Sequence, residues 1–354
     1  LLEYPDAAAK TDQEVRGRTV QLDTGEGLRP AEAAQAVTGF IGAGNYATQV
    51  LIPAFSQTSA VLKSVASAAG VSGVHAAKKF RIPQTTTDSN EIIANTDINT
   101  VVVTTRHNSH ANFVCQALEA GKHVFVEKPL ALTREELRQI EETYGQQASQ
   151  RGAPLLMVGF NRRFAPHIGK IKKLIDGVRE PKSFVMTVNA GAIPADHWTQ
   201  DKTVGGGRII GEGCHFVDLL RFLAGTPIVS TQAIMMGQVD GVPIRDDKVS
   251  ISLSFEDGSF GTVHYLANGH KGFPKERLEV FCAGRILQLD NFRSLRGYGW
   301  PGFSKMNLWR QDKGNAACVA AFVDAVQHGK ASPIPFDQLV EVTRVTFDIV
   351  EKLG

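Results

Sequence analysis

Apolar residues recur in two different patterns along the chain, and the pattern changes near Gly159. Before this point, short apolar runs alternate with segments whose apolar residues lie three or four positions apart. Such alternation predicts strands and helices in turn, and therefore a doubly wound parallel sheet of the α/β class. We expect strands at VTGFIG, VLKSVAS, INTVVVTT, HVFVE and LLMVGF. We expect helices over residues 44–60, kinked at Pro53, and over residues 71–80, 89–95, 109–121 and a stretch after Thr133.

After Gly159, apolar and polar residues alternate with a period of two, which predicts strands with one buried face. We expect these strands at SFVMTVNA, IVSTQAIMM, VSISLSF, SFGTVHYLA, RLEVFCA and RILQLD. Asp257-Gly258 and Ala283-Gly284 are typical of hairpin turns. This half is therefore expected to be an α+β domain with a large, mostly antiparallel open sheet. Its uncovered face is a candidate surface for a homodimer or tetramer.

Residues 1–36 show no clear period and are rich in Ala, Gly, Thr and charged residues, which is typical of an arm or linker. Only Leu1–Tyr4 has a strand-like pattern. We therefore divide the chain into this arm, a parallel-sheet domain over residues 37–159, and the antiparallel domain over residues 160–354. Two interpretations of the arm stay open: a trimmed end, or the tail of a preceding part of a longer polypeptide.

Composition excludes several classes of protein. The 354 residues are 43% hydrophobic and 21% charged, with a net charge of +2, which does not suggest a nucleic-acid-binding protein. No apolar run is long enough to span a bilayer, and no signal peptide is visible. The four cysteines lie far apart and form no Cys-x-x-Cys pair, so we expect neither a metal site nor disulfides, and a cytoplasmic location.

A glycine-rich turn follows the first predicted strand and opens the first predicted helix. Its sequence is Gly42-Ala43-Gly44-Asn45-Tyr46-Ala47, the G-x-G-x-x-A form of the dinucleotide-binding motif. Gly42 permits the tight turn, Gly44 lets a pyrophosphate approach the backbone, and Ala47 keeps the helix close to the strand. The motif lies within a strand–helix series, so it predicts a Rossmann domain that binds a dinucleotide.

The second strand carries information about which dinucleotide is bound. NAD-binding domains usually end this strand with an acidic residue that binds the ribose hydroxyls. Here the strand ends in SVASAAG, with Ser67 near the expected place and no acid. Lys78 and Lys79 follow on the next helix and are candidates to meet a 2′-phosphate. We therefore expect NAD(P), with NADP slightly favoured over NAD.

One helix in the second half carries candidate chemistry, within GGGRIIGEGCHFVDLLRFLAG. Glu212 and Asp218 each lie three residues from His215, so helical spacing allows either carboxylate to contact the imidazole. A carboxylate near an imidazole orients it and raises its basicity. The preceding glycines allow a loop to pass close to a ligand.

The stretch HVFVEKPLAL places an acid and a base at the end of a buried strand. Ligands bind at the carboxyl edge of a doubly wound sheet, so Glu127 and Lys128 should lie beside a nicotinamide. Pro129 fixes the backbone after Lys128, and the bond between them is a candidate for the cis form. A lysine here can hold a substrate hydroxyl and lower its pKa as hydride leaves the carbon.

Several of these segments together resemble the Gfo/Idh/MocA oxidoreductase family. They are the Gly42 turn, TTRHNSHANFVCQALEAGKHVFVEKPLAL, GFNRRFAP and GCHFVDLLRFLAG. The resemblance covers residues 37–354 and implies hydride exchange between NAD(P) and a hydroxyl of a sugar, cyclitol or nucleotide-sugar. It implies that Lys128 is the active-site lysine and His215 the acid/base. It also implies that a polar turn, with Thr105, Asn108 and His110, lies near the cofactor, and that Asn161 and Arg162 lie near nicotinamide and substrate.

The chain departs from this family in one place. The family often has Asp four residues before the histidine, where this sequence has Gly211, so Glu212 becomes the candidate proton relay. The segment LLEYP resembles the end of a zinc-type medium-chain alcohol dehydrogenase, as in proteins that join such a domain to a Gfo/Idh/MocA half.

The substrate is less defined. Lys271, Lys275 and Arg277 lie close together in NGHKGFPKER and are candidates to meet the diphosphate of a nucleotide-sugar, although a solvated basic loop explains them equally well. Asn161 and Asp218 are further candidate substrate contacts. Two other functions stay open: a non-redox enzyme that uses NAD transiently, as some glycosidases do, and a non-catalytic NADP-binding regulator.

Overall fold

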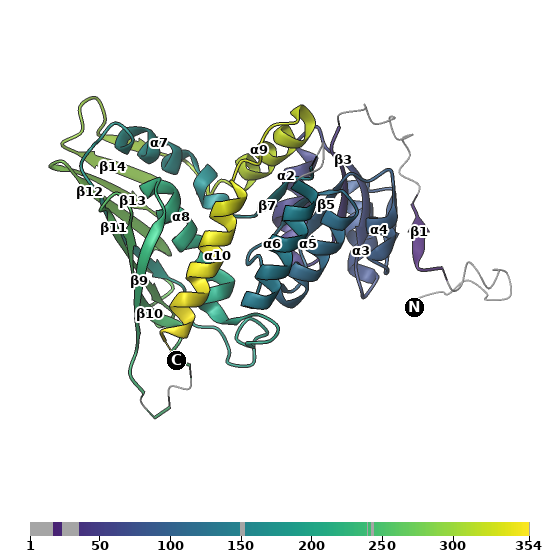
Figure 1. Cartoon of the computed structure of the whole chain (residues 1–354), viewed down its shortest axis with the longest axis horizontal. Helices are drawn as coiled ribbons and strands as arrows, with labels where there is room; N and C mark the ends of the chain where they lie inside the picture. The colour runs from purple at the N-terminus through teal and green to yellow at the C-terminus, as the bar shows by residue number, and fades with distance from the viewer. Residues whose placement is uncertain (1–16, 23–34, 149–152, 239, 242–243, 354) are drawn as a thin grey trace.

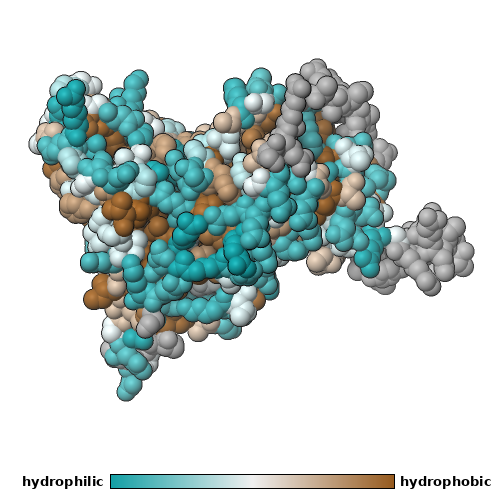
Figure 2. Space-filling model, in the orientation of Figure 1, coloured by the Kyte–Doolittle hydropathy of each residue, from teal (hydrophilic) through white to brown (hydrophobic). Residues whose placement is uncertain are grey.

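The computed structural model describes residues 17–22, 35–148, 153–238, 240–241 and 244–353. Within them the chain forms two β-sheets, one in each domain, with helices packed between and around them (Figure 1). The expected strand at residues 1–4 and the inference drawn from it lie outside the described residues. The face seen in Figure 2 is largely hydrophilic, with hydrophobic residues exposed in separate patches. No described helix is long and apolar enough to cross a membrane.

The first domain is built on a seven-stranded sheet in the order β1-β4-β3-β2-β5-β6-β7. Its strands are β1 (Thr19–Gln21), β2 (Val37–Ile41), β3 (Val61–Ala66), β4 (Gln84–Thr86), β5 (Thr100–Val103), β6 (His123–Val126) and β7 (Leu156–Val158). Strands β2 to β7 run parallel, which confirms the predicted doubly wound sheet. Strand β1 comes from the expected linker and pairs antiparallel with β4. The strand order reverses at β2, so the loops after β2, β3 and β5 diverge around a crevice.

The helices of this domain are η2 (Ala47–Leu51), α2 (Ile52–Ser56), α3 (Val71–Phe80), α4 (Asn90–Ala94), η3 (His107–Ser109), α5 (His110–Glu119) and α6 (Arg134–Ala148). At the expected kink near Pro53 the helix changes from the π-helix η2 to α2. Pro53 lies in the first turn of α2, directly after η2, and has no N–H to donate to the preceding turn. Thr133 caps α6 as predicted, because its Oγ1 accepts the backbone N–H of Glu136 at 3.1 Å.

The second domain is built on an eight-stranded sheet in the order β15-β14-β13-β12-β8-β11-β10-β9. Its strands are β8 (Ser183–Asn189), β9 (Ile228–Met235), β10 (Lys248–Phe255), β11 (Phe260–Leu266), β12 (Glu276–Cys282), β13 (Arg285–Asp290), β14 (Ser294–Tyr298) and β15 (Lys305–Asn307). Only β8 and β11 pair in parallel, so the sheet is mostly antiparallel, as predicted. The hairpins at Gly258 and Gly284 are also confirmed, since both glycines have positive φ. Strands β14 and β15 were not predicted.

Helices cover one face of this sheet and join it to the first domain. They are η4 (Asn161–Phe164), α7 (Pro166–Ile175), η5 (Ile209–Gly213), α8 (Cys214–Ala224), α9 (Asn315–His328) and α10 (Phe336–Glu351). The C-terminal helix α10 packs against α8 and β9 on one side and against α6 on the other (Figure 1). Arg134 on α6 donates hydrogen bonds to Glu351 at 2.8 Å and to Asp348. The two domains therefore share helical contacts beside the crevice.

Candidate functional site

A cavity of about 940 Å³ lies at the carboxyl edge of the parallel sheet, between the two domains. Its first wall follows the ends of β2, β3, β5 and β6, and its second wall comes from η4, η5, α8 and the segment before α9. Most of the predicted site residues line it: Gly42, Gly44, Asn45, Tyr46, Ala47, Ser67, Thr105, His110, Glu127, Lys128, Asn161, Arg162, Glu212 and His215. Asn108, Asp218, Lys271 and Lys275 do not line it.

The Gly42–Ala47 turn leaves room for a ligand phosphate. Gly42 has φ +109°, and a Cβ there would lie 2.7 Å from backbone atoms of Thr104. A Cβ on Gly44 would meet nothing within 4 Å, so the cavity reaches the backbone at this point. The helical segment that begins after this turn directs backbone N–H groups toward the same space. The turn therefore fits the pyrophosphate of a dinucleotide.

The wall beyond the end of β3 is lined by hydroxyl groups. Ser67 lines the cavity and shares a hydrogen bond of 2.5 Å with Ser72. Thr87 and Ser89 line the same cavity. Lys78 and Lys79 lie in the last turn of α3 and do not line it. The start of this helix faces Ser67, so its last turn lies roughly 10 Å further away, and the expectation that these lysines meet a 2′-phosphate is wrong.

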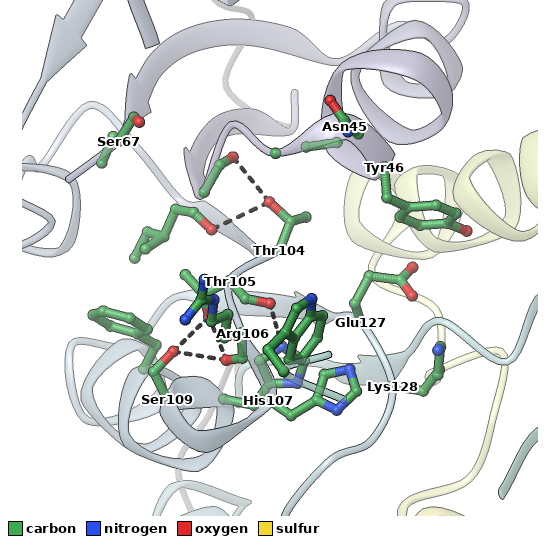
Figure 3. Close-up of a pocket in the computed structure, with 18 of the residues that line it drawn as sticks. Asn45, Tyr46, Ser67, Thr104, Thr105, Arg106, His107, Ser109, Glu127 and Lys128 are labelled. Atoms are coloured by element: carbon green, nitrogen blue, oxygen red, sulfur yellow. Dashed lines mark hydrogen bonds between the residues drawn. The ribbon is translucent and has the colours of Figure 1, made fainter. Parts of the chain in front are cut away.

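Glu127 and Lys128 both enter the cavity directly after β6 (Figure 3). Lys128 Nζ donates a hydrogen bond of 2.7 Å to the carbonyl oxygen of Gly211, and the Lys128–Pro129 bond is cis, as anticipated. Glu127 is buried, and burial raises the pKa of its carboxyl to about 7. A Cβ on Gly159 would lie 2.5 Å from Glu127 Oε1, so this glycine makes the room for the carboxyl group.

His215 lines the cavity from the first turn of α8 and is 6% exposed. Burial, together with the positive charges of Arg162, Lys128, Lys313 and Lys275, holds the pKa of its imidazole well below the usual value. The ring is therefore neutral at pH 7. Its buried Nδ1 has no hydrogen-bond partner among the described residues. The predicted hydrogen bond between this ring and Glu212 or Asp218 does not form in the described part of the chain.

Glu212 is held by three hydrogen-bond donors, none of which is His215. Its carboxylate accepts hydrogen bonds from Tyr265 at 2.6 Å, Arg208 at 2.8 Å and Lys275 at 2.9 Å. Burial alone would raise the pKa of Glu212, but these three partners lower it well below its ordinary value. Residues 209–213 form a π-helix, so Glu212 and His215 do not follow the α-helical period. The three-residue spacing between them therefore does not bring their side chains into contact.

Asp218 is also unavailable to His215. It is 0% exposed and forms an ion pair with Arg163, with a shortest N···O distance of 2.7 Å. It lies behind the cavity wall and contacts no part of the cavity. Its prediction as a substrate contact is therefore wrong, because a buried carboxylate needs its own cation and Arg163 supplies it.

Two cations on the second wall share one buried carboxylate. Arg162 donates from Nε and Nη2 to Glu276, both at 2.8 Å, and Lys313 Nζ lies 2.6 Å from the same group. Although burial opposes it, these cations lower the pKa of Glu276 to about 2. Asn161 supports the arrangement, because its Nδ2 donates to the carbonyl oxygen of Lys313 at 2.7 Å. No sequence pattern links Glu276 or Lys313 to the site.

The polar turn after β5 contributes His107 to the cavity in addition to the expected Thr105 and His110. His107 lines the cavity, and its Nδ1 bonds to the carbonyl oxygen of Gly205 at 2.8 Å. Because a carbonyl only accepts, Nδ1 carries the proton and Nε2 carries the lone pair. Burial and the charge of Lys128 lower the pKa of His107 to about 3. The ring of Trp198 lies edge-on to the His107 ring, with 4.8 Å between the ring centroids.

The neighbours of His107 have structural contacts. The backbone N–H of Asn108 donates a hydrogen bond of 3.1 Å to the carbonyl oxygen of Val204. His110 is fully buried, and its ring nitrogens lie 2.7 Å from the oxygen of Pro129 and 3.2 Å from that of Thr105. Several residues that line the cavity were not predicted from the sequence: Thr87, Ser89, Thr104, Arg106, Ser109, Phe113, Trp198 and Asn315. Trp198 lies in an irregular loop with no recognisable sequence pattern.

The predicted basic cluster near residue 275 is divided between two carboxylates. Lys275 pairs with Glu212, while Arg277 pairs with Glu279 at 3.2 Å. Lys271 is exposed. The three side chains therefore do not converge on one binding point.

Family models and relatives agree with this arrangement. The NAD-binding Rossmann-fold model of the Gfo/Idh/MocA oxidoreductase family matches residues 37–160, and the C-terminal-domain model of this family matches residues 170–287. Inositol 2-dehydrogenase of Rhizobium meliloti (strain 1021) is 27% identical over 304 residues, covering 82% of this chain and 88% of that protein. Levoglucosan dehydrogenase of Pseudarthrobacter phenanthrenivorans is 28% identical, covering 66% of each chain.

Solved structures share the fold across both domains. A levoglucosan dehydrogenase in complex with NADH and levoglucosan has a TM-score of 0.77 at 23% identity and covers 89% of this chain and 96% of its own. An oxidoreductase domain protein from Kribbella flavida has a TM-score of 0.78 at 24% identity and covers 90% and 97%. Since the two family models together span more than half of the sequence, the chain belongs to the Gfo/Idh/MocA family of oxidoreductases, with its NAD-binding Rossmann domain and its C-terminal domain.

Proposed function

We propose that this protein is an NAD(P)-dependent dehydrogenase that transfers hydride between the nicotinamide and a hydroxyl-bearing carbon of a sugar or cyclitol. The observation that carries the proposal is that Lys128 and His215, from different domains, line one cavity with the Gly42–Ala47 turn. The inositol and levoglucosan dehydrogenases named above support this substrate class.

The cofactor is proposed to lie across the carboxyl edge of the parallel sheet. Gly42 to Ala47 bind the pyrophosphate, the wall with Ser67 receives the adenosine ribose, and Glu127 and Arg162 lie toward the nicotinamide. A wall of hydroxyl groups without a lining carboxylate does not repel a 2′-phosphate. We therefore keep NADP as slightly favoured over NAD, without a role for Lys78 and Lys79.

His215 and Lys128 divide the acid–base work. When bound, the nicotinamide supplies the hydride acceptor. His215 is neutral and accepts the proton of the reacting hydroxyl, and Lys128 stabilises the negative charge that develops on that oxygen. Glu212 has its lone pairs engaged by three donors, so we assign it to positioning Lys275 and Tyr265 instead of proton relay.

The geometry favours a free sugar over a nucleotide-sugar. Lys275 is engaged by Glu212, and Arg277 by Glu279, so the basic loop has few free charges for a diphosphate. Asn161 remains a candidate substrate neighbour, because it lines the cavity and anchors Lys313.

The open sheet face is proposed as the surface of a homodimer or tetramer. Cross-strand register puts Phe281, Ser183 and Phe260 in one row on the outer face. Phe260 is 51% exposed and Ile234, on the same face, is 70% exposed. Covering such apolar side chains stabilises an oligomer. Light scattering of the wild type and of Phe260→Lys tests this, since the substitution should lower the measured mass.

The first experiment is a fluorescence titration of the chain with NADPH and NADH, followed by absorbance at 340 nm with a panel of sugars and cyclitols. Binding of a cofactor and net nicotinamide reduction support the dehydrogenase. Binding without net reduction, in the presence of glycoside cleavage, would instead support a non-redox enzyme. Binding with neither activity would support a regulator.

A further inference from the structure

Positive charges around His215 outnumber the carboxylates that face them. Arg162 and Lys313 share the single charge of Glu276, while Arg208 and Lys275 share that of Glu212. Lys128 is bonded to a carbonyl oxygen. Arg162 and Lys313 line the cavity, so the pair that shares Glu276 leaves one positive charge inside it, whereas Arg208 and Lys275 do not line the cavity. The other carboxylate near Arg162 is Glu127, whose pKa burial raises to about 7. Such a surplus is costly at a buried position unless a ligand compensates it.

The surplus on the second wall comes with free hydrogen-bond donors. Glu276 accepts from Nε and Nη2 of Arg162, which leaves Nη1 with no hydrogen-bond partner among the described residues. The ammonium of Lys313 has three N–H groups and donates one to Glu276. Both side chains line the cavity. A guanidinium and an ammonium with spare donors on one wall are suited to an anionic oxygen pair.

The segment that carries Lys313 is fixed by close packing. Gly314 has φ +82°, and a Cβ there would lie 2.4 Å from the backbone oxygen of Asn161 and 2.5 Å from backbone atoms of Phe164 and Ala165. The Nδ2 of Asn161 bonds to the carbonyl oxygen of Lys313. Lys313 is therefore held against η4, beside Arg162, before any ligand arrives.

The second wall also contains Gly211, in η5, which carries no side chain. Position 211 is glycine, and a Cβ there would meet His107 Cε1 at 2.9 Å and the oxygen of Gly205 at 3.2 Å. A side chain at this position has no room while His107 occupies it. The substrate region thus has these cations and no carboxylate at position 211.

From this geometry we propose that the substrate carries a carboxylate beside the reacting carbon, bound by Arg162 Nη1 and Lys313 Nζ. This inference rests on the proposed function and narrows it to sugar acids, such as uronic and aldonic acids. Two cations minus the one charge of Glu276 leave a single positive charge, which matches a carboxylate. A phosphomonoester carries a larger charge at pH 7 and matches less well.

The test compares matched neutral and acidic sugars with the whole chain and saturating NAD⁺ or NADP⁺ at constant ionic strength. The pairs are glucose with glucuronate, glucose with gluconate, and galactose with galacturonate, with glucose 6-phosphate as the phosphate probe. The expected result is a kcat/KM at least tenfold higher for an acid than for its neutral partner. Equal or better turnover of the neutral members, or a preference for the phosphate, would overturn the carboxylate assignment.

Variants locate the binding groups. Lys313→Met should reduce the acid-to-neutral ratio at least tenfold, mainly through KM, and Lys313→Arg should restore most of it. Lys305→Met, an exposed lysine on β15, is the matched control and should leave the ratio unchanged. A ratio that stays the same in Lys313→Met would overturn the assignment.

Measuring the binding of the sugar acids distinguishes a failure of this inference from a failure of the proposed function. The acids are titrated against the protein with bound NADH, following the cofactor fluorescence, which requires no turnover. Binding of glucuronate or galacturonate that weakens in Lys313→Met supports the inference even if no compound is oxidised, in which case the dehydrogenase proposal alone fails. Turnover of neutral sugars without any binding of the acids overturns the inference and leaves the dehydrogenase intact.

Discussion

Lys128 and Gly211 are joined by a hydrogen bond of 2.7 Å from the lysine ammonium to the glycine carbonyl oxygen. Lys128 lies two residues after the end of strand β6 in the parallel sheet, and Gly211 lies in η5, four residues before His215. The two residues proposed to act on the reacting hydroxyl are therefore fixed relative to each other through one backbone contact between domains. Preorganised donors of this kind stabilise charge that develops during reaction.

Replacing Lys128 tests this relationship directly. Lys128→Met keeps an unbranched side chain, one atom shorter, and removes the charge. We expect kcat to fall by about a hundredfold or more, since a positioned acid–base or electrostatic group contributes about 10²–10⁴-fold. The dissociation constant of the cofactor should change only a few-fold, because the pyrophosphate turn is untouched. Steady-state kinetics and cofactor fluorescence measure the two quantities.

Lys78→Met is the control for this experiment, because Lys78 is exposed at the end of α3. It should change neither turnover nor NADPH affinity. Turnover in Lys128→Met within threefold of the wild type would remove the assigned role. A large loss of NADPH affinity in Lys78→Met would restore the 2′-phosphate contact that the geometry argues against.

The second prediction concerns the space at position 211. Gly211→Ala brings a Cβ to 2.9 Å from His107 Cε1, and the ring has Trp198 and Gly205 on its other sides. Overpacking of this kind costs about 1–3 kcal/mol of unfolding free energy. Gly169→Ala, in the interior of α7, is the matched control because its Cβ would meet nothing within 4 Å. It should stabilise the protein by up to about 1 kcal/mol.

The double variant Gly211→Ala/His107→Ala shows whether the two positions compete for one space. If they do, the double variant should lose about 1 kcal/mol less unfolding free energy than the sum of the two single losses, because neighbouring sites couple. Additive effects in chemical denaturation would contradict the steric explanation for the missing acid.

The third prediction uses the buried carboxyl group of Glu127. Burial raises its pKa from 4.5 to about 7, so the folded state binds a proton that the unfolded state has released between these two values. The contribution of this group to stability is therefore present below about pH 4.5 and is lost as the pH rises through about 7. Glu127→Gln cannot ionise, so it should be more stable than the wild type at pH 8, by about 3 kcal/mol at most.

The measurement is denaturant unfolding of both proteins without cofactor at intervals from pH 4.5 to 8. The difference between wild type and Glu127→Gln should grow as the pH rises. Glu119→Gln, an exposed carboxylate at the end of α5, should give no such trend. A difference that is constant over this range would mean that the carboxyl group has an ordinary pKa in the folded state.

Local sequence rules predicted those parts of the fold that local chemistry determines. Helix α3 begins at Val71 and ends at Phe80, as its apolar period indicates. The hairpin at Ala283-Gly284 forms because both residues take positive φ, which this turn requires. The Gly42 motif likewise predicted a tight turn at the edge of the sheet, where Gly42 has positive φ. In each case the determining contacts lie within a few residues.

The charge pairing of the site could not be predicted in this way. Arg162 and Glu276 lie 114 positions apart, and no local pattern couples them. The spacing of Glu212 and His215 predicted a contact that does not form, because η5 is a π-helix and does not follow the 3.6-residue period. The polar turn after β5 was recognised, but which of its side chains enters the cavity depends on the loop that brings Gly205 and Trp198 against it.

The last prediction concerns Glu276, which compensates Arg162 and Lys313. Its side chain is 0% exposed in the ion pair, and the two cations lower its pKa from 4.5 to about 2. Glu276→Gln keeps the shape but leaves two cations without their counter-charge. Removing one partner of a buried pair costs about 3–5 kcal/mol, so we expect a loss in unfolding free energy near the lower figure at pH 7.

The direction of the pKa shift predicts how the stability difference between wild type and Glu276→Gln changes with pH. A lowered pKa means that the contribution of Glu276 is present above about pH 4.5 and is lost as the pH falls toward 2. The difference between wild type and Glu276→Gln in urea unfolding should therefore be full at pH 7 and shrink below pH 4.5. Glu256→Gln, an exposed carboxylate after β10, should show no difference at either pH. An effect of Glu276→Gln that is small at pH 7 would mean that the two cations are compensated by solvent, and it would remove the charge surplus from which a carboxylate-bearing substrate is inferred.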